Sequence, residues 1–118
     1  EIRNVPLEIR IEGKPEIFYG ETFEDLGFYK DAPVLPFSTL GTLGWAHSDQ
    51  NLNDGSSQFF IFLYEAELTP AGRNLVDGRN AAFGYVIEGS EIIKDLKTND
   101  QIISIEVIDG ANLLKSHA

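Results

Sequence analysis

The chain has 118 residues with 9 Lys or Arg against 19 Asp or Glu, and its net charge of −10 argues against binding nucleic acid or anionic membrane surfaces. Its composition, 42% hydrophobic and 24% charged, is that of one globular domain. Cysteine is absent, which excludes disulfide bonds, thiolate catalysis and zinc sites built on cysteine. No apolar run approaches the roughly 20 residues that cross a bilayer, so we expect no direct membrane insertion.

The first half of the chain is predicted to form short strands. Residues 5–11 alternate apolar and polar side chains, which is the period of a half-buried strand. Residues 17–19 are a second short apolar segment. Residues 40–46 also have the character of a strand, although Gly41 and Gly44 interrupt it. Glycine inside a strand indicates a bulge or the close approach of another group to the backbone.

The second half contains the strongest strand signal and a short helix. Residues 58–64 are apolar on both faces, so we predict a central strand with a neighbour on each side. A long irregular connection over residues 65–80 leads to a strand at 82–88. Residues 90–97 are predicted to form a helix with one buried face, and residues 102–108 form a final strand. This succession favours a β-barrel or a β-sandwich.

Metal and cofactor sites are not expected. Residues 49–60 begin like a calcium-binding loop, but Asp54 and Phe60 stand where such a loop requires glycine and glutamate. His47 and His117 are the only histidines, which are too few to converge on a zinc ion. We therefore predict neither a metal ion nor a cofactor.

Two longer motifs point to a family. Residues 55–61 read Gly-Ser-Ser-Gln-Phe-Phe-Ile, and residues 77–89 read Asp-Gly-Arg-Asn-Ala-Ala-Phe-Gly-Tyr-Val-Ile-Glu-Gly. In order and separation they resemble the signature of the cyclophilins, a family of peptidyl-prolyl cis-trans isomerases. Residues 19–25 resemble the family's Gly-Glu-x-Phe-x-Asp loop, and residues 41–46 resemble the strand before the first signature motif.

The resemblance is closer to the large chloroplast thylakoid-lumen cyclophilins, whose C-terminal domains carry segments similar to residues 5–9 and 67–70. It implies a mainly β fold, a closed antiparallel β-barrel with capping helices, and a location in the thylakoid lumen. Residues 1–118 would then form the C-terminal part, two-thirds or so, of a single cyclophilin-like domain. The family's first strands and first helix would lie upstream, as expected for a chain without an initial methionine.

The resemblance also implies a reaction, the cis-trans isomerisation of Xaa-Pro bonds in protein segments, with photosynthetic membrane complexes among the partners. Rotation about such a bond crosses a barrier of about 20 kcal/mol because the twisted amide loses its resonance. No bond breaks, so neither a nucleophile nor a metal is required. The protein must hold the proline ring in an apolar pocket and bind the twisted amide better than either planar isomer.

The resemblance assigns the catalytic pair to Gln58 and Phe60. Phe60 would form the floor of the proline pocket, with Val76 on its wall, and Gln58 would hydrogen-bond the substrate backbone. The family's arginine, which faces the proline nitrogen, would lie upstream, and removal of one such preorganised donor typically costs about 10²–10³ in rate.

Five further residues are implied in substrate binding. Ala46, His47 and Ser48 match the segment whose main chain aligns the bound peptide as an added strand. Asn80 stands where most active members have histidine, and Leu75 where many have tryptophan. These two replacements keep open the alternative of a catalytically weak or inactive module that binds and assembles photosynthetic complexes. Without the family, the default is an acidic β-barrel interaction domain without chemistry.

Overall fold

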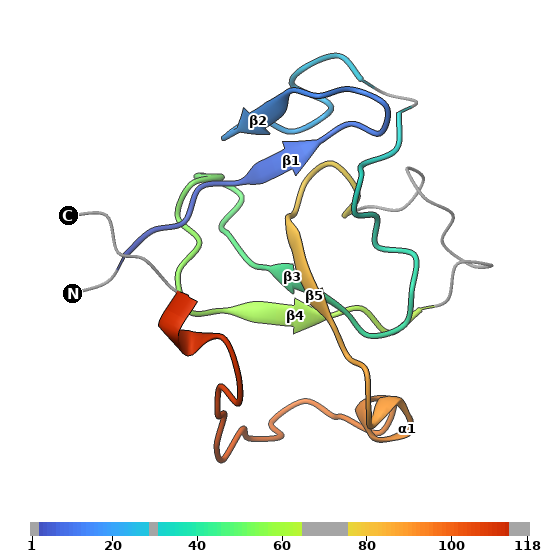
Figure 1. Ribbon diagram of the computed structural model, residues 1–118, viewed down its shortest axis with the longest axis vertical. Coiled ribbons are helices and arrows are strands. Elements are labelled where there is room, and N and C mark those ends of the chain that lie inside the picture. The colour runs from blue at the N-terminus through green and yellow to red at the C-terminus, as the bar shows by residue number, and fades with distance from the viewer. Residues whose placement is uncertain (1–2, 29–30, 65–75, 114–118) are drawn as a thin grey trace.

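The computed structural model describes residues 3–28, 31–64 and 76–113. Their regular elements are short strands, one helical turn and one 3-10 turn: β1 (Glu8–Arg10), β2 (Ile17–Tyr19), β3 (Thr42–Trp45), β4 (Phe59–Ile61), β5 (Ala82–Tyr85), α1 (Ser90–Ile93) and η1 (Ala111–Leu113). The strands form an antiparallel β1–β2 hairpin and a separate antiparallel sheet with the order β4-β3-β5 (Figure 1). The predicted irregular connection at residues 65–80 is described only from residue 76, where it forms a turn, and its first part, residues 65–75, lies outside the described residues.

The alternating segment at residues 5–11 behaves as predicted. Leu7, Ile9 and Ile11 are buried, with 3%, 6% and 1% of their surface exposed, while the side chains between them face solvent. Only β1 is a regular strand, because this segment changes partners along its length: it pairs with β2 in the middle and makes single bridges to Gly55 and Pro33 at its ends.

β3 is the centre of the second sheet, and Gly44 within it has both properties that a strand glycine suggests. The pairing of β3 with β5 shifts register between Leu43 and Gly44, which is a bulge. A side chain at Gly44 would overlap the ring of Phe60 and lie 2.7 Å from Cε1 of Phe37. Gly44 is therefore the point where two aromatic rings approach the backbone.

The two faces of this sheet differ in how well they are covered. On one face Phe37, which is fully buried, stacks on Phe60 with a centroid distance of 5.3 Å. On the other face Trp45 and Phe59 both contact the ring edge or face of Phe83, at 5.1 and 6.4 Å. Half of the surface of Phe83 stays exposed, so this second aromatic face is only partly covered.

The predicted central strand at residues 58–64 is an edge strand within the described chain, since β4 pairs with β3 alone. Main-chain hydrogen bonds continue the pairing beyond β4 at both ends, from Ala46 N to Gln58 O and from Phe62 N to Thr42 O. The prediction of a strand is confirmed, but its burial on both faces is not: Phe62 is buried, whereas Phe59, Leu63 and Tyr64 are exposed. The second neighbour that the prediction requires is not among the described strands.

The predicted helix at residues 90–97 is shorter than expected. α1 ends at Ile93, and the next turn is closed by hydrogen bonds from Asp95 N to Ile92 O and from Leu96 N to Ile93 O, which span three residues. Ile93 is buried, whereas Ile92 and Leu96 are 64% and 49% exposed, so this helical turn covers little apolar surface of the sheet. In the described part of the chain no helix is both long and apolar enough to cross a membrane.

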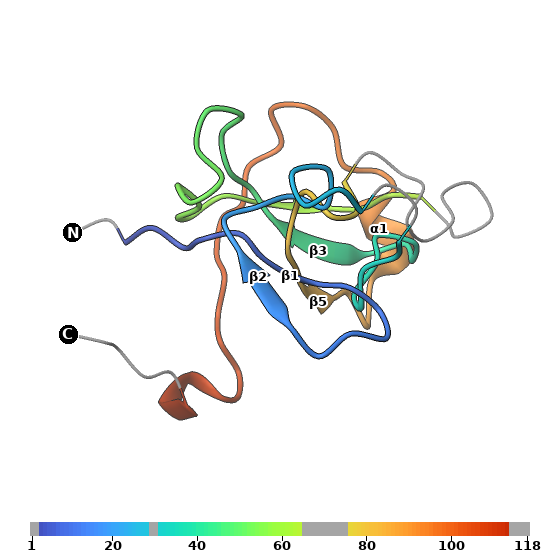
Figure 2. The same cartoon turned by 90° about the horizontal axis from the view of Figure 1, so that it is seen from above.

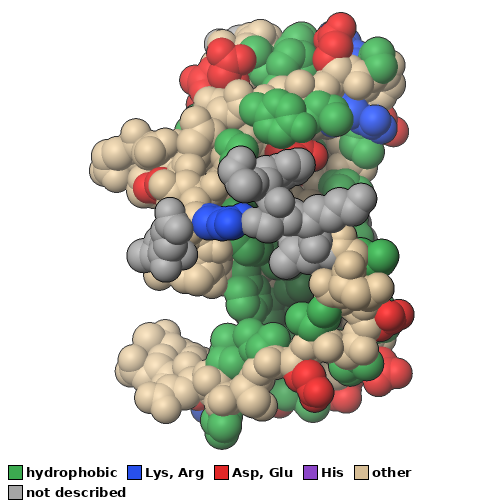
Figure 3. All heavy atoms as spheres, turned by 60° about the vertical axis from the view of Figure 1, so that its left-hand side comes forward, with side chains coloured by type: hydrophobic (Ala, Val, Ile, Leu, Met, Phe, Trp, Pro, Cys, Tyr) green, Lys and Arg blue, Asp and Glu red, His purple; other side chains and the backbone are tan. Residues whose placement is uncertain are grey.

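The predicted strand at residues 102–108 is wrong for the described structure. This segment is extended but joins no sheet, as Figures 1 and 2 show, and Ile103 and Ile108 are 97% and 94% exposed. A hollow lined by hydrophobic side chains lies between it and the rest of the molecule (Figure 3). A strand needs a hydrogen-bonded neighbour, and none is described here.

The prediction of a closed barrel is also wrong for the described residues. The described strands form one sheet of two strands and one of three, and they do not close on each other. Closure requires a complete ring of paired strands, and the unpaired segment at residues 102–108 shows where pairing is missing.

We expect Phe37→Ala to lower the free energy of unfolding by about 3–5 kcal/mol, because it removes a fully buried ring that stacks on Phe60 and lies 6.0 Å from Phe62. Ile87→Ala is the control, since Ile87 is 91% exposed and its loss should change stability by less than about 0.5 kcal/mol. Urea unfolding followed by circular dichroism measures both. Equal stability of the two variants would contradict the assignment of Phe37 to the core.

Candidate functional site

The end of β3 and the start of β4 bring the first group of predicted residues together. Ala46 N donates to Gln58 O at 3.1 Å, so these residues continue the β3–β4 ladder beyond the named strands. Side chains alternate along a strand, so Ala46 and Gln58 share the face on which Phe60 lies over Gly44. The Gln58 side chain is exposed there, and Phe60 is half-buried.

The loop that follows is fixed around Ser48. Ser48 N donates to a carboxylate oxygen of Asp54 at 2.8 Å, and Asn51 N donates to the Ser48 hydroxyl at 3.1 Å. Hydrogen bonds from the Ser48 hydroxyl and then from its N–H lower the pKa of the Asp54 carboxyl below its ordinary value of 3.8, while desolvation raises it and the charge of His47 lowers it slightly. These bonds therefore hold above pH 4 and weaken only as the pH falls through the lowered pKa.

A second group comes from the turn before β5. Its main chain is closed by hydrogen bonds from Arg79 N and Asn80 N, both to Val76 O at 3.1 Å. Asn80 Nδ2 donates to Trp45 O at 3.1 Å, and the Nε2 atom of His47 lies 2.7 Å from Arg79 O. The turn is thus attached to the end of β3. Val76 is half-buried, and Leu75 lies outside the described residues.

The segment at residues 19–25 is attached to the same turn. Phe23 N donates to Gly78 O at 2.9 Å, and the Glu24 carboxylate pairs with the Arg79 guanidinium at 2.7 Å. Gly78 has a φ of 76°, and a Cβ there would lie 2.6 Å from the Phe23 ring, so only glycine fits. The ion pair is exposed and adds little stability. The close packing of the Phe23 ring on Gly78 is therefore the main contact between residues 19–25 and the turn.

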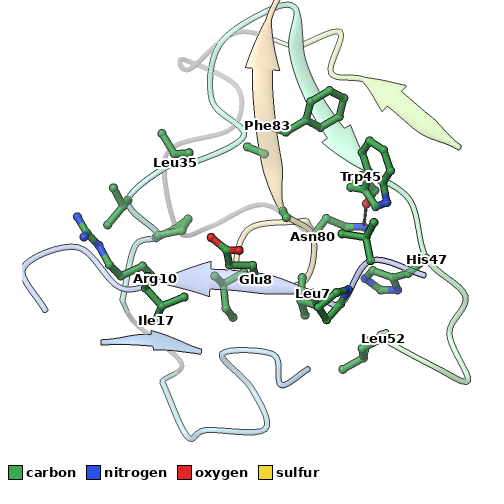
Figure 4. Close-up of a pocket in the computed structure, with 17 residues that line it drawn as sticks. Leu7, Glu8, Arg10, Ile17, Leu35, Trp45, His47, Leu52, Asn80 and Phe83 are labelled. Atoms are coloured by element: carbon green, nitrogen blue, oxygen red, sulfur yellow. Dashed lines mark hydrogen bonds between the residues drawn. The ribbon is translucent and has the colours of Figure 1, made fainter. Parts of the chain in front are cut away.

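A cavity of about 520 Å³ lies beside these groups, between residues 5–10, the end of β3 and the start of β5. His47 and Asn80 line it together with Trp45, Leu7 and Phe83 (Figure 4). The other predicted residues with described positions do not line it: Ala46, Ser48, Gln58, Phe60 and Val76. Two of the predicted residues therefore line this cavity, and the other five with described positions do not.

Trp45 is not among the site residues that the motifs predict. Its indole Nε1 is buried and has no hydrogen-bond partner among the described residues, while its ring lines the cavity. The available signal was that it is the only tryptophan in the chain and stands between Gly44 and Ala46. As for metals, no three His, Asp or Glu side chains of the described residues gather as a metal site would require.

Comparison with known proteins agrees with the motifs. The chain is 46% identical over 114 residues to a Synechocystis protein named "putative thylakoid lumen peptidyl-prolyl cis-trans isomerase sll0408", covering 97% of this chain and 30% of that protein. It is 47% identical over 108 residues to the chloroplastic isomerase CYP38 of Arabidopsis thaliana, covering 92% of this chain and 25% of that protein. A human relative named "probable inactive peptidyl-prolyl cis-trans isomerase-like 6" is 38% identical over 82 residues, covering 70% of this chain and 22% of that protein.

The chain therefore spans less than a third of the length of these relatives. A family model described as cyclophilin type peptidyl-prolyl cis-trans isomerase/CLD matches residues 1–111. Since this match covers nearly the whole chain and its motifs meet at the ends of β3, β4 and β5, the protein belongs to the cyclophilin-type peptidyl-prolyl cis-trans isomerases.

Proposed function

We propose that the chain binds proline-containing protein segments and isomerises their Xaa-Pro bonds, as the C-terminal part of a single cyclophilin domain. The observation that carries the proposal is the shared face of Phe60, Gln58 and Ala46: an apolar ring, an exposed amide and a strand end adjoin one another. The proline ring of a bound segment needs an apolar surface, which the Phe60 ring offers. The backbone on either side of the proline needs hydrogen-bonding groups, which the Gln58 amide and the strand end at Ala46 offer.

The chemistry follows from this arrangement. An extended peptide would add along residues 46–48, with the exposed Gln58 amide binding its backbone and its proline ring against Phe60 and Val76. Because residue 44 has no side chain, the Phe60 ring approaches the backbone there and stacks on Phe37, and this packing would hold the floor of the proline pocket. Catalysis then requires tighter binding of the twisted amide than of either planar isomer.

A second candidate function is binding without appreciable turnover. Asn80, which stands in place of the family's usual histidine, donates its amide to Trp45 O, so this group serves the protein's own main chain. One relative is itself named as probable inactive. In this alternative the protein is a binding or assembly module of photosynthetic complexes, and its proposed location in either case is the thylakoid lumen, by similarity to the plant and cyanobacterial relatives.

NMR exchange spectroscopy on an Ala-Pro peptide separates the two functions. We expect the protein to shorten the time of cis-trans exchange well below the tens of seconds of the uncatalysed reaction. Phe60→Ala should abolish this acceleration, because the proline pocket loses its floor. Phe59→Ala is the matched control, since Phe59 is the preceding residue on the opposite face of β4 and should leave exchange intact.

Three outcomes are distinguishable. Accelerated exchange that depends on Phe60 supports the isomerase. Peptide shifts that saturate without faster exchange support the binding module. Neither shifts nor exchange would show that the face of Phe60 and Gln58 is not a peptide site.

Gly44→Ala tests how the pocket floor is held. The added methyl would overlap the Phe60 ring and press on Phe37, so we expect peptide affinity to fall at least about tenfold and stability to fall by about 1–3 kcal/mol. In the control Gly84→Ala, the new Cβ would meet only Leu43 Cδ1 at 3.4 Å. Peptide titration and urea unfolding give both quantities, and wild-type affinity in Gly44→Ala would refute this role of Phe60.

A further inference from the structure

The imidazole ring of His47 has an unusual pair of neighbours. Its Nδ1 atom lies 2.9 Å from Ser48 O, and its Nε2 atom lies 2.7 Å from Arg79 O. A carbonyl oxygen only accepts hydrogen bonds, so each ring nitrogen must donate to make both contacts. Neutral imidazole has one N–H, whereas the imidazolium ion has two. The geometry therefore fits the charged ring.

We propose that the protonated His47 ring positions the turn at residues 76–80 against the end of β3, so that peptide binding at this site weakens as His47 loses its proton. The binding part of this inference rests on the proposed function. His47 thereby acts as a positioning residue, because both of its ring nitrogens are directed at the protein's own main chain.

The ring is well placed for this role because it lies between two parts of the proposed site. One contact is to the segment at residues 46–48, and the other is to the turn that carries Val76 and Asn80. The Asn80 amide, which donates to Trp45 O, is the second side-chain link across the same junction. Loss of one ring proton leaves a nitrogen lone pair facing a carbonyl oxygen, which turns one of the two His47 contacts from attractive to repulsive.

The charged groups around the ring come from three elements. On the loop after β3, the Asp54 carboxylate interacts with the charge of His47, and Asp49 follows two residues along the chain. On β1, Glu8 and Arg10 line the same cavity with opposite charges. Because the pKa of Asp54 is lowered, its carboxylate stays ionised throughout the range in which histidine changes charge, about pH 5 to 8.

The turn contributes the remaining charges. The Arg79 guanidinium is directed to Glu24, at 2.7 Å, and so is neutralised by its partner. The Asp77 carboxylate accepts a hydrogen bond from Phe37 N at 2.6 Å. These are the charged groups that the turn places near the ring, and the comparison with a variant that lacks His47 separates their effect from that of histidine.

The first measurement observes the ring directly. In 15N-labelled protein carrying His117→Gln, which removes the only other histidine signal, we expect both His47 ring N–H protons to be visible at pH 5. Hydrogen-bonded N–H groups exchange slowly with water, whereas those of a free histidine peptide do not give observable signals. If the two protons exchange as rapidly as in the free peptide, His47 makes no such link and the proposal is overturned.

The second measurement is titration of the Ala-Pro peptide at pH 5 and pH 8, with His47→Asn as the comparison because its amide carries no charge at either pH. We expect about tenfold weaker binding at pH 8 in the protein with His47, as loss of one charge-assisted hydrogen bond predicts. In His47→Asn the affinity should not change with pH. The same pH dependence in both proteins, or none in either, would overturn the positioning role.

Failure of the proposed function has a different signature. If no peptide binds at either pH while both ring N–H protons are protected, the peptide site is refuted. The positioning of the turn is then still decided by the Arg79 and Asn80 amide shifts, which should move between pH 5 and 8 in the protein with His47 and stay constant in His47→Asn. Constant shifts in both proteins would overturn it.

Discussion

The arrangement of the site depends on the close approach of two phenyl rings to the backbone at Gly44. Phe37 is fully buried against Phe60, and the space that they occupy exists only because residue 44 has no side chain. The Phe37 main chain also donates to Asp77, so the same packing that holds the ring of Phe60 fixes the start of the turn that leads to β5. One contact therefore joins the sheet, the preceding loop and the turn.

Main-chain hydrogen bonds, rather than side-chain pairs, then bring the functional residues together. Ala46 and Gln58 meet through the extension of the β3–β4 ladder, and Asn80 and His47 reach the carbonyl groups of Trp45 and Arg79. Such contacts fix positions because each joins a side chain or strand end to a main-chain group of another element. Two of the predicted substrate-binding residues, His47 and Asn80, therefore direct their side chains to carbonyl groups of the protein's own main chain.

The apolar surface that the described chain leaves open has the same physical origin as its missed strands. Phe83 is half exposed on the second face of the sheet, and the isoleucines of residues 102–108 face solvent along an extended segment. In both places an apolar segment lacks a neighbouring strand among the described residues, and its side chains stay exposed. An apolar pattern indicates that a segment prefers to be buried against a neighbour. The hydrogen bonds that make the segment a strand form only between two paired segments, so they depend on the partner as well.

The sequence by itself determined local properties: the alternation that buries Leu7, Ile9 and Ile11, the close approach at Gly44, and the motifs that identify the family. It also predicted a closed barrel, a central strand at 58–64 and a final strand at 102–108, and the described structure has none of these, because closure and pairing depend on partners that an apolar period does not name. Only the tertiary structure decided that His47 contacts Arg79 O and that Asn80 lines the cavity whereas Phe60 does not. The contacts of His47 with Arg79 O and of Asn80 with Trp45 O join residues more than thirty positions apart in the chain, and so they follow from how the chain packs, which a local pattern does not encode.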